Sequence, residues 1–227
     1  MAAWSELVQT QYPPPSVFDF NPIEKRDLNR FVRIIMTEEI PFACQRFPMQ
    51  FEFARGRAAE ALGIHPKQIS LTGSARIGYS LSPNQFGKTF EPLTSDIDLF
   101  VVDSKLFDGL VDDFDNFIEA WKSDSIGPQN QKQEQYWNSS RDKDPHNIEN
   151  GFLDAYHIPA EKRFPTSYRI SYAAIGFEKN LEQQMGRKVG SKAKIRVYRD
   201  WHGAIDRITF NIKSALKYRT NAALPQV

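Results

Sequence analysis

Cysteine is almost missing from this sequence, and long hydrophobic runs are missing altogether. Cys44 is the only cysteine among 227 residues, which excludes an internal disulfide and any zinc cluster built on cysteines. Its neighbours Phe42, Ala43 and Phe47 indicate a packed core residue rather than a nucleophile. No stretch approaches the 18 apolar residues of a membrane-spanning helix, and no charged-then-apolar signal peptide opens the chain. We therefore expect a soluble, cytoplasmic protein with no membrane partner.

An excess of charge is also missing, and histidine is scarce. The chain has 29 lysines and arginines against 28 acidic residues, a formal net charge of +1, which gives no overall attraction to nucleic acid or membrane. The four histidines show no pair at metal-binding spacing on one helix, so we expect them to be structural or exposed: His65, His146, His157 and His202. With 41% hydrophobic and 13% aromatic residues, the chain can bury a sizeable core. Its length suits one large domain, or a core with a smaller lobe.

The most informative stretch runs from residue 69 to residue 103. A short apolar run, Ile69 to Leu71, breaks at Gly73-Ser74 and leads into an expected helix. Glycine lets the backbone approach a ligand closely. Ser74 and the free amides of the following helix can receive phosphate oxygens, with help from the helix dipole.

Two aspartates open the second strand of this stretch. Asp96 and Asp98 run directly into Leu99–Val102, whose β-branched and apolar residues favour a buried strand. Side chains alternate faces along a strand, so the two carboxylates should project from one face, roughly 6–7 Å apart. Like charges on a half-buried strand repel each other and lose hydration, which favours a divalent cation between them. A solvated strand end or a turn is the other interpretation of such a pair.

Together these residues resemble a known family. Gly73-Ser74-x-x-x-Gly78 followed by Ser95-Asp96-x-Asp98-Leu99 resembles the signature of the nucleotidyltransferase superfamily with a DNA polymerase β-like core, in its minimal bacterial form. The resemblance implies that Gly73 and Ser74 contact the triphosphate of an NTP such as ATP. It also implies that Asp96 and Asp98 bind the Mg²⁺ (or Mn²⁺) ions that assist nucleotidyl transfer. Phosphate donors beside metal-binding carboxylates suit metal-assisted attack at phosphorus.

The link between the two motifs is longer than the resembled family usually carries. Residues 80–94 include Asn84, Gly87 and Lys88, and they form either a flexible flap over the nucleotide or a surface loop. Arg76, inside the first motif, and Lys88, inside the link, are our further candidates for nucleotide binding.

The third carboxylate of the resembled family is not evident. The family places it on a strand that pairs with the Asp-x-Asp strand, and our best candidate for that strand, 194–199, has Arg196 at the expected position. Asp154 or Asp200 is a possible replacement for that ligand. Two carboxylates suffice for one Mg²⁺, since the ion keeps several waters and also binds phosphates. Arg196 can instead grip a triphosphate, because a guanidinium suits paired oxygens.

A basic run surrounds this strand, with six cations at Arg187, Lys188, Lys192, Lys194, Arg196 and Arg199. The run could neutralise a triphosphate or follow a nucleic-acid backbone. It could equally be a solvated strand edge, which lysines commonly protect from aggregation.

The fold class we expect is α/β (α+β), with a small mixed sheet, flanking helices and a helical second lobe. Strands are predicted at 69–71, 96–102 and 194–199. Periodicity predicts helices over 23–46, 47–62, 105–122, 181–187 and 201–219, and Pro41 is expected to end or kink the first of them. We interpret 164–177 as a short strand or a bend. The polar segment 123–150 is interpreted as a mobile insertion with a short helix around Trp137.

Three parts follow from this organisation. The first is a proline-rich arm, 1–22, whose aromatic residues are expected to strap it across the surface, with partner binding as the alternative: Trp4, Tyr12, Phe18 and Phe20. The second, 23–103, holds N-terminal helices and the Gly-Ser/Asp-x-Asp core. The third, 104–227, holds the rest of the core and the helical lobe.

The leading hypothesis is an enzyme that moves an NMP from an NTP to a hydroxyl acceptor and releases pyrophosphate. The acceptor is open among RNA, a nucleotide, a small molecule and a protein hydroxyl. The alternative is a catalytically reduced nucleotidyltransferase fold that binds a nucleotide or a partner. Two other classes use aspartate pairs. Haloacid-dehalogenase-like phosphatases are disfavoured because their apolar strand precedes the aspartate pair, whereas here it follows. Metal-dependent glycosyltransferases are disfavoured because that assignment would give the Gly-Ser unit no role.

Overall fold

The computed structural model describes residues 8, 10–19 and 23–222 of the chain, the side chains of 219–222 excepted. Its longer helical segments are α2 (Lys25–Phe31), α3 (Pro48–Leu62), α5 (Ser104–Lys122), α6 (Gln131–Glu149), α7 (Pro165–Met185) and α8 (Trp201–Ala222), with the short α4 (Gly73–Ile77) after the first strand. Within these ranges no helix is both long enough and apolar enough to cross a membrane.

A four-stranded mixed sheet forms the centre. Its strands are β1 (Ile69–Thr72), β2 (Ile97–Val102), β3 (Phe152–Asp154) and β4 (Ala193–Tyr198), in the spatial order β1-β2-β4-β3. β2 pairs antiparallel with β1 and parallel with β4, and β3 pairs antiparallel with β4. This confirms the expected α+β fold with a small mixed sheet. Strand β3 is an addition to the three predicted strands.

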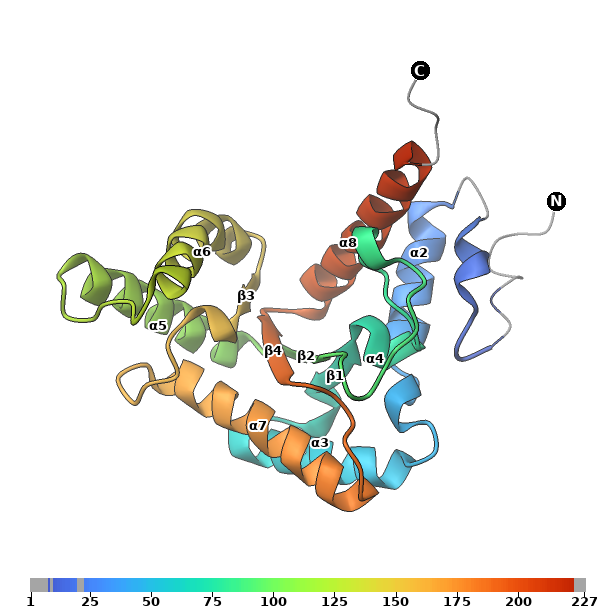
Figure 1. Cartoon of the computed structure of the whole chain (residues 1–227), viewed down its shortest axis with the longest axis horizontal. Coiled ribbons are helices and arrows are strands. Elements are labelled where there is room, and N and C mark those ends of the chain that lie inside the picture. Colours follow the sequence, from blue (N-terminus) through green and yellow to red (C-terminus); the bar gives the residue numbers. More distant parts are fainter. Residues whose placement is uncertain (1–7, 9, 20–22, 223–227) are drawn as a thin grey trace.

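Alternation along β2 divides the molecule into two packed faces. Ile97, Leu99 and Val101 enter a large core that also contains residues of α3, α5 and α7. Phe100 and Val102 point to the other face, where a smaller core joins residues of α2 and α8. Figure 1 shows α3 beside α7 on one side of the sheet and α2 beside α8 on the other. Because Asp98 lies between Leu99 and Ile97 in this pattern, it projects toward the α8 side.

The predicted helices at 47–62, 105–122 and 201–219 are confirmed as α3, α5 and α8. The region 23–46 is not one helix. It contains α2, a π-helical turn at Val32–Met36 and a short 3-10 helix at Phe42–Cys44. Cys44 is fully buried, as its neighbours indicated.

The described part of the proline-rich arm packs against the body of the protein. Pro15–Asp19 forms a short 3-10 helix that buries Val17 and Phe18. The ring of Phe18 lies edge-on to Phe31 and Phe86. These contacts favour the intramolecular strap; Trp4 and Phe20, also expected to pin the arm, lie outside the described residues.

The segment 123–150 differs most from expectation. Instead of a mobile insertion with a short helix, it contains the 19-residue helix α6, capped by Asn130, whose side chain accepts a hydrogen bond from Gln133 N. Trp137 is buried, with its ring 5.0 Å from that of Phe117. A helix so polar gives almost no apolar periodicity, and one aromatic anchor fixes it to the core.

The interpretation of 164–177 as a strand or bend is also wrong. These residues begin α7, a helix of 21 residues that includes the segment where a separate brief helix was expected. Pro165 occupies the first turn, where a missing N–H costs no hydrogen bond. The alternating aromatic and aliphatic residues resembled a strand, but Ile170, Ala174 and Phe177 form a helical stripe buried against α3.

Candidate functional site

The Gly73-Ser74 turn lies directly against the second aspartate. Thr72, the last residue of β1, pairs with Asp98 in the sheet register. Gly73 has a φ of +65°, and a Cβ added to it would lie 3.0 Å from Asp98 Oδ2. The position therefore requires glycine for two reasons, backbone conformation and space. The structure brings together the two motifs that the sequence separates by more than twenty residues.

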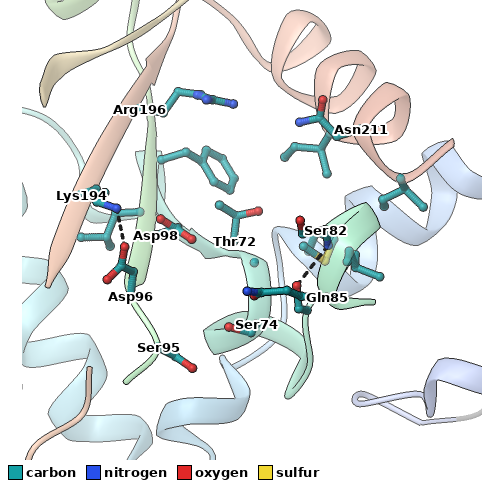
Figure 2. Close-up of a pocket in the computed structure, with 18 of the residues that line it drawn as sticks. Thr72, Ser74, Ser82, Gln85, Ser95, Asp96, Asp98, Lys194, Arg196 and Asn211 are labelled. Carbon is teal, nitrogen blue, oxygen red and sulfur yellow. Dashed lines mark hydrogen bonds and ion pairs between the residues drawn. The ribbon is translucent and has the colours of Figure 1, made fainter. Parts of the chain in front are cut away.

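A cavity of about 730 Å³ opens at this point. Asp96, Asp98 and Lys194 line one side, from β2 and its approach and from β4, while Ser82 and Asn211 line the opposite side (Figure 2). The cavity lies between the sheet and α8, on the face of the sheet that α2 and α8 cover, and clefts of this kind between packed elements commonly bind ligands.

The long link between the motifs forms a wall of this cavity. Tyr79 and Thr89 pair as an isolated bridge, and Ser80 N donates to Lys88 O. Gln85 and Lys88 line the cavity, the first from a short 3-10 helix at Pro83–Gln85. Lys88 is thus placed where a ligand's phosphates can reach it. The loop also carries Phe86, which packs on the N-terminal arm.

Asp98 carries a carboxylate without a partner. Within the described part of the chain, no side chain or amide donates a hydrogen bond to it, and burial raises its pKa above the ordinary value. Lys194 and Arg196 favour the ionised form through their charge, but they do not overcome the loss of hydration. A half-buried carboxylate in this state gains from any cation that enters the cavity.

Asp96, two residues earlier, is already satisfied. Its Oδ1 accepts a hydrogen bond of 2.6 Å from Ser191 Oγ, and its Oδ2 forms an ion pair with Lys194 Nζ. Burial is the largest single influence and disfavours the ionised form. The bonds from Lys194 and Ser191 together outweigh it and hold the pKa of Asp96 below its ordinary value. The two aspartates of one motif therefore have opposite electrostatic surroundings.

The sheet register corrects our placement of the third acid. The residue of β4 opposite Asp98 is Lys194, and Arg196 lies opposite Phe100. Both side chains line the cavity, so the strand presents two cations where the resembled family presents a carboxylate. Of the two proposed replacements, Asp154 lines the cavity but is paired with Arg196, and Asp200 is not among the residues that line it; its Oδ1 accepts a hydrogen bond from Gly203 N at the start of α8.

Arg196 and Asp154 form a bidentate ion pair. Arg196 Nε lies 2.8 Å from Asp154 Oδ1, and Nη2 lies 2.7 Å from Oδ2. Burial alone would lower the pKa of Arg196, but the hydrogen bonds and charge of Asp154 raise it. The pairing uses one edge of the guanidinium, Tyr198 is a further hydrogen-bond partner, and the side chain lines the cavity.

Arg76 does not reach the cavity. Its guanidinium is buried under the N-terminal segment, where Nε donates to Ile35 O at 2.7 Å and Nη1 donates to Glu39 O. Burial lowers its pKa to about 10. This placement gives Arg76 a structural role in joining α4 to residues 35–39, and it does not support the expected contact with a nucleotide.

The basic run likewise divides. Lys194 and Arg196 line the cavity, whereas Arg199 pairs with Asp108 on the surface and Arg187 lies over the ring of Phe47. A continuous track for a nucleic-acid backbone is not formed by these side chains.

The donor set suits one divalent cation. Within the ranges described, His, Cys, Asp and Glu side chains nowhere gather in groups of three that could hold a metal. Asp98 offers an unpartnered carboxylate beside a glycine that leaves space, and Asp96 projects from the same strand. Mg²⁺ is commonly bound through one or two carboxylates with waters and phosphates completing its shell. The residues present therefore fit Mg²⁺ or Mn²⁺, provided that Lys194 shares Asp96 with the ion.

Sequence reasoning missed the arrangement of partners around these residues. Lys194 was one of six cations in a basic run, and its pairing with Asp96 follows from the parallel β2–β4 register. Tyr156, which lines the cavity from the turn after β3, gave no signal at all. A prediction of β3 would have placed Asp154 beside Arg196, but a three-residue strand carries too little pattern to be found.

Comparison with known proteins gives no independent assignment. No protein-family model matches the chain, and neither a curated protein nor a solved structure is significantly similar to it. The residues and the geometry of the cavity are therefore what a functional proposal has to use.

Proposed function

We propose that this chain binds a nucleoside triphosphate in the 730 Å³ cavity and transfers its NMP to a hydroxyl acceptor, with release of pyrophosphate. The observation that carries the proposal is the contact of the Gly73 turn with Asp98, where a Cβ would lie 3.0 Å from Oδ2. A triphosphate held at that turn would lie beside the two carboxylates of the Asp-x-Asp motif. The resemblance to the nucleotidyltransferase superfamily supports the same assignment.

Each residue has a role in this proposal. The backbone at Gly73 and Ser74 binds phosphate oxygens, and Lys88, from the link, and Arg196, from β4, add positive charge. Asp96 and Asp98 hold Mg²⁺ or Mn²⁺. When bound, the cation would stabilise charge at phosphorus and increase the acidity of the acceptor hydroxyl.

Lys194 adds a constraint to this scheme. It neutralises Asp96 when no ligand is present, and a triphosphate gives its ammonium group a second anionic partner. Binding of the nucleotide and release of Asp96 from Lys194 should therefore favour each other, because the same ammonium cannot serve both oxygens fully.

Transfer is tested with labelled NTPs and Mg²⁺ or Mn²⁺, offered with RNA, nucleotides, small-molecule alcohols and the protein itself as acceptors. We expect labelled product and pyrophosphate from the wild type and at least about a hundredfold loss in Asp98→Asn, because the change removes a ligand of the ion that would stabilise charge at phosphorus. Asp115→Asn, an exposed change on α5, is the matched control and should keep full activity. Absence of product with every acceptor, or equal activity in Asp98→Asn, would refute the transfer step.

A second function is favoured by one observation. Lys194 occupies the β4 position opposite Asp98, and Lys194 and Arg196 give the cavity two cations where the resembled family has a third acid. This charge pattern suits a reduced nucleotidyltransferase fold that binds a nucleotide without transferring it.

Calorimetry separates the two functions. Tight NTP binding that does not depend on Mg²⁺, together with no turnover, supports the binding protein. Binding that requires the ion, is weakened by Asp98→Asn and leads to pyrophosphate release supports the transferase.

A further inference from the structure

A buried carboxylate of α6 lies behind the cavity wall. Asp144 has no exposed surface. Its Oδ1 accepts a hydrogen bond from Asn147 Nδ2 at 2.9 Å, and its Oδ2 lies 2.7 Å from His157 Nδ1. Burying a carboxylate is costly unless it is paired and hydrogen-bonded. His157 is thus a partner that Asp144 needs, and the histidine is not an isolated surface residue.

The other nitrogen of His157 faces the cavity side. His157 Nε2 lies 3.9 Å from Asp154 Oδ2, the same oxygen that accepts from Arg196 Nη2 at 2.7 Å. Four side chains therefore form a row, Asp144, His157, Asp154 and Arg196, which joins α6 to a cation that lines the cavity.

The protonation of His157 decides whether this row is continuous. A neutral imidazole donates at only one nitrogen, and that donor is used by Asp144. An imidazolium donates at both, so it can bond to Asp144 and attract Asp154 at once. Two carboxylates and one guanidinium leave a net negative charge, which an imidazolium would cancel. The row as drawn by the structure is therefore charge-balanced in the protonated form.

Among the described residues, Asp144 and Asp154 are the charged side chains that pair with His157, and Lys192 and Lys194 line a second pocket together with it. The ring of Tyr136, from α6, lies 5.4 Å away and that of Tyr156, next in the chain, lies 4.7 Å away, both edge-on. Burial raises the pKa of both phenols, that of Tyr156 to about 12, so both stay neutral near physiological pH. Beyond Tyr156 lies Lys194, whose ammonium is 5.7 Å from that ring.

We infer that Asp144 and His157 are positioning residues for Arg196, and that protonation of His157 strengthens the hold of Arg196 on an anionic ligand in the cavity. A protonated His157 partly neutralises Asp154, so Asp154 neutralises less of the positive charge of Arg196 and more of that charge acts on the ligand. It also fixes Asp154 from behind, so the guanidinium keeps the orientation in which it lines the cavity. The inference rests on the proposed function in one respect, namely that the ligand carries phosphates.

The test uses the full-length protein and inorganic tripolyphosphate as the probe, with binding measured by calorimetry near pH 6 and near pH 8.5, on either side of the range in which histidine side chains usually titrate. His157→Gln is compared with wild type, and His146→Gln is the matched control, since the side chain of His146 on α6 is exposed and contacts the nearby Glu149 and Asn150. Asp144→Asn is the second variant, because it keeps the size of the buried side chain.

At the lower pH, we expect wild type and His146→Gln to bind tripolyphosphate about tenfold more tightly than His157→Gln does. This is the size of loss seen when supporting residues are removed. At the higher pH, all three proteins should bind it with similar affinity. In Asp144→Asn, the increase in tripolyphosphate affinity at the lower pH should be partly lost. Protonation of the probe itself affects all variants equally and cancels in the comparison. An equal change with pH in wild type and His157→Gln would overturn the inference.

A second measurement does not need a ligand. The Nε–H resonance of Arg196 in ¹⁵N NMR spectra should shift between the two pH values in wild type and stay fixed in His157→Gln. If tripolyphosphate fails to bind while this resonance responds, the proposed function fails and the positioning row stands. If it binds and the resonance does not respond, the positioning row fails and the proposed function stands.

Discussion

The two halves of the cavity's sheet wall handle acidic side chains in opposite ways. On β1 and β2, Asp98 sits half-buried beside Gly73 with no donor among the described residues. On β4 and β3, Asp154 is buried but holds a bidentate bond to Arg196. One half keeps a carboxylate in an unfavourable state, and the other neutralises its carboxylate completely. Proteins accept such a local cost mainly where a ligand relieves it, and this difference is the reason we propose the β1–β2 half as the cation site.

The largest effect should come from breaking the neutralised half. Asp154→Asn leaves the guanidinium of Arg196 without its carboxylate, and we expect a loss of about 3 kcal/mol in the free energy of unfolding, the lower end for a buried pair because Arg196 reaches the cavity. Urea denaturation measures it. Asp108→Asn is the control, since it breaks an equivalent aspartate–arginine pair on the surface and should cost less than about 1 kcal/mol. Equal losses would show that the buried pair has no special weight.

A smaller loss is expected from filling the space in the other half. Gly73→Ala forces an L side chain into a φ of +65° and brings its Cβ to 3.0 Å from Asp98 Oδ2. The conformational penalty is about 1–2 kcal/mol of unfolding free energy. Binding of an NTP should weaken by more than the stability does, because the added methyl group occupies the phosphate approach.

Gly56→Ala provides the matched control for this change. Gly56 lies inside α3 with open space around its Cβ position, so alanine there should stabilise the protein by about 0.5–1 kcal/mol. If Gly73→Ala binds tripolyphosphate as tightly as Gly56→Ala does, the turn is not the phosphate site.

The sequence predicted one half of this wall better than the other, and the reason is physical. The β1–β2 half is local: a glycine, a serine and two aspartates within residues 69–103 already contain the turn, the strand and the acids. The β4–β3 half is assembled from residues 154, 157, 194 and 196, whose closeness depends on strand order and on α6. Sequence patterns reveal neither the strand order nor the position of α6, because β3 is three residues long and α6 is anchored to the core mainly through Trp137.

The smallest and most diagnostic effect concerns Asp98 itself. Burial raises its folded-state pKa above the ordinary 3.8, so the folded protein binds this proton more readily than the unfolded chain does. The stability associated with the protonated form is complete below that value and is lost as the pH rises through the folded-state pKa. Asp98→Asn removes the charge and should therefore stabilise the ligand-free protein at pH 7, on the order of 1 kcal/mol. The gain should shrink toward zero as the pH falls through the raised folded-state pKa and below the ordinary value, because the wild-type carboxyl then becomes protonated as well.

Denaturant unfolding of wild type and Asp98→Asn at several pH values measures this difference, and Asp96→Asn serves as the contrast. The pKa of Asp96 is lowered by the bonds from Lys194 and Ser191, against the effect of burial, so its ionised form stabilises the fold above the ordinary value and the same substitution there should destabilise at pH 7. Opposite signs for two aspartates two positions apart would establish that the motif separates a paired acid from one kept unpaired for a cation. A destabilising Asp98→Asn would instead mean that this carboxylate already has a partner in the folded protein, and the argument for a cation at β1–β2 would lose its basis.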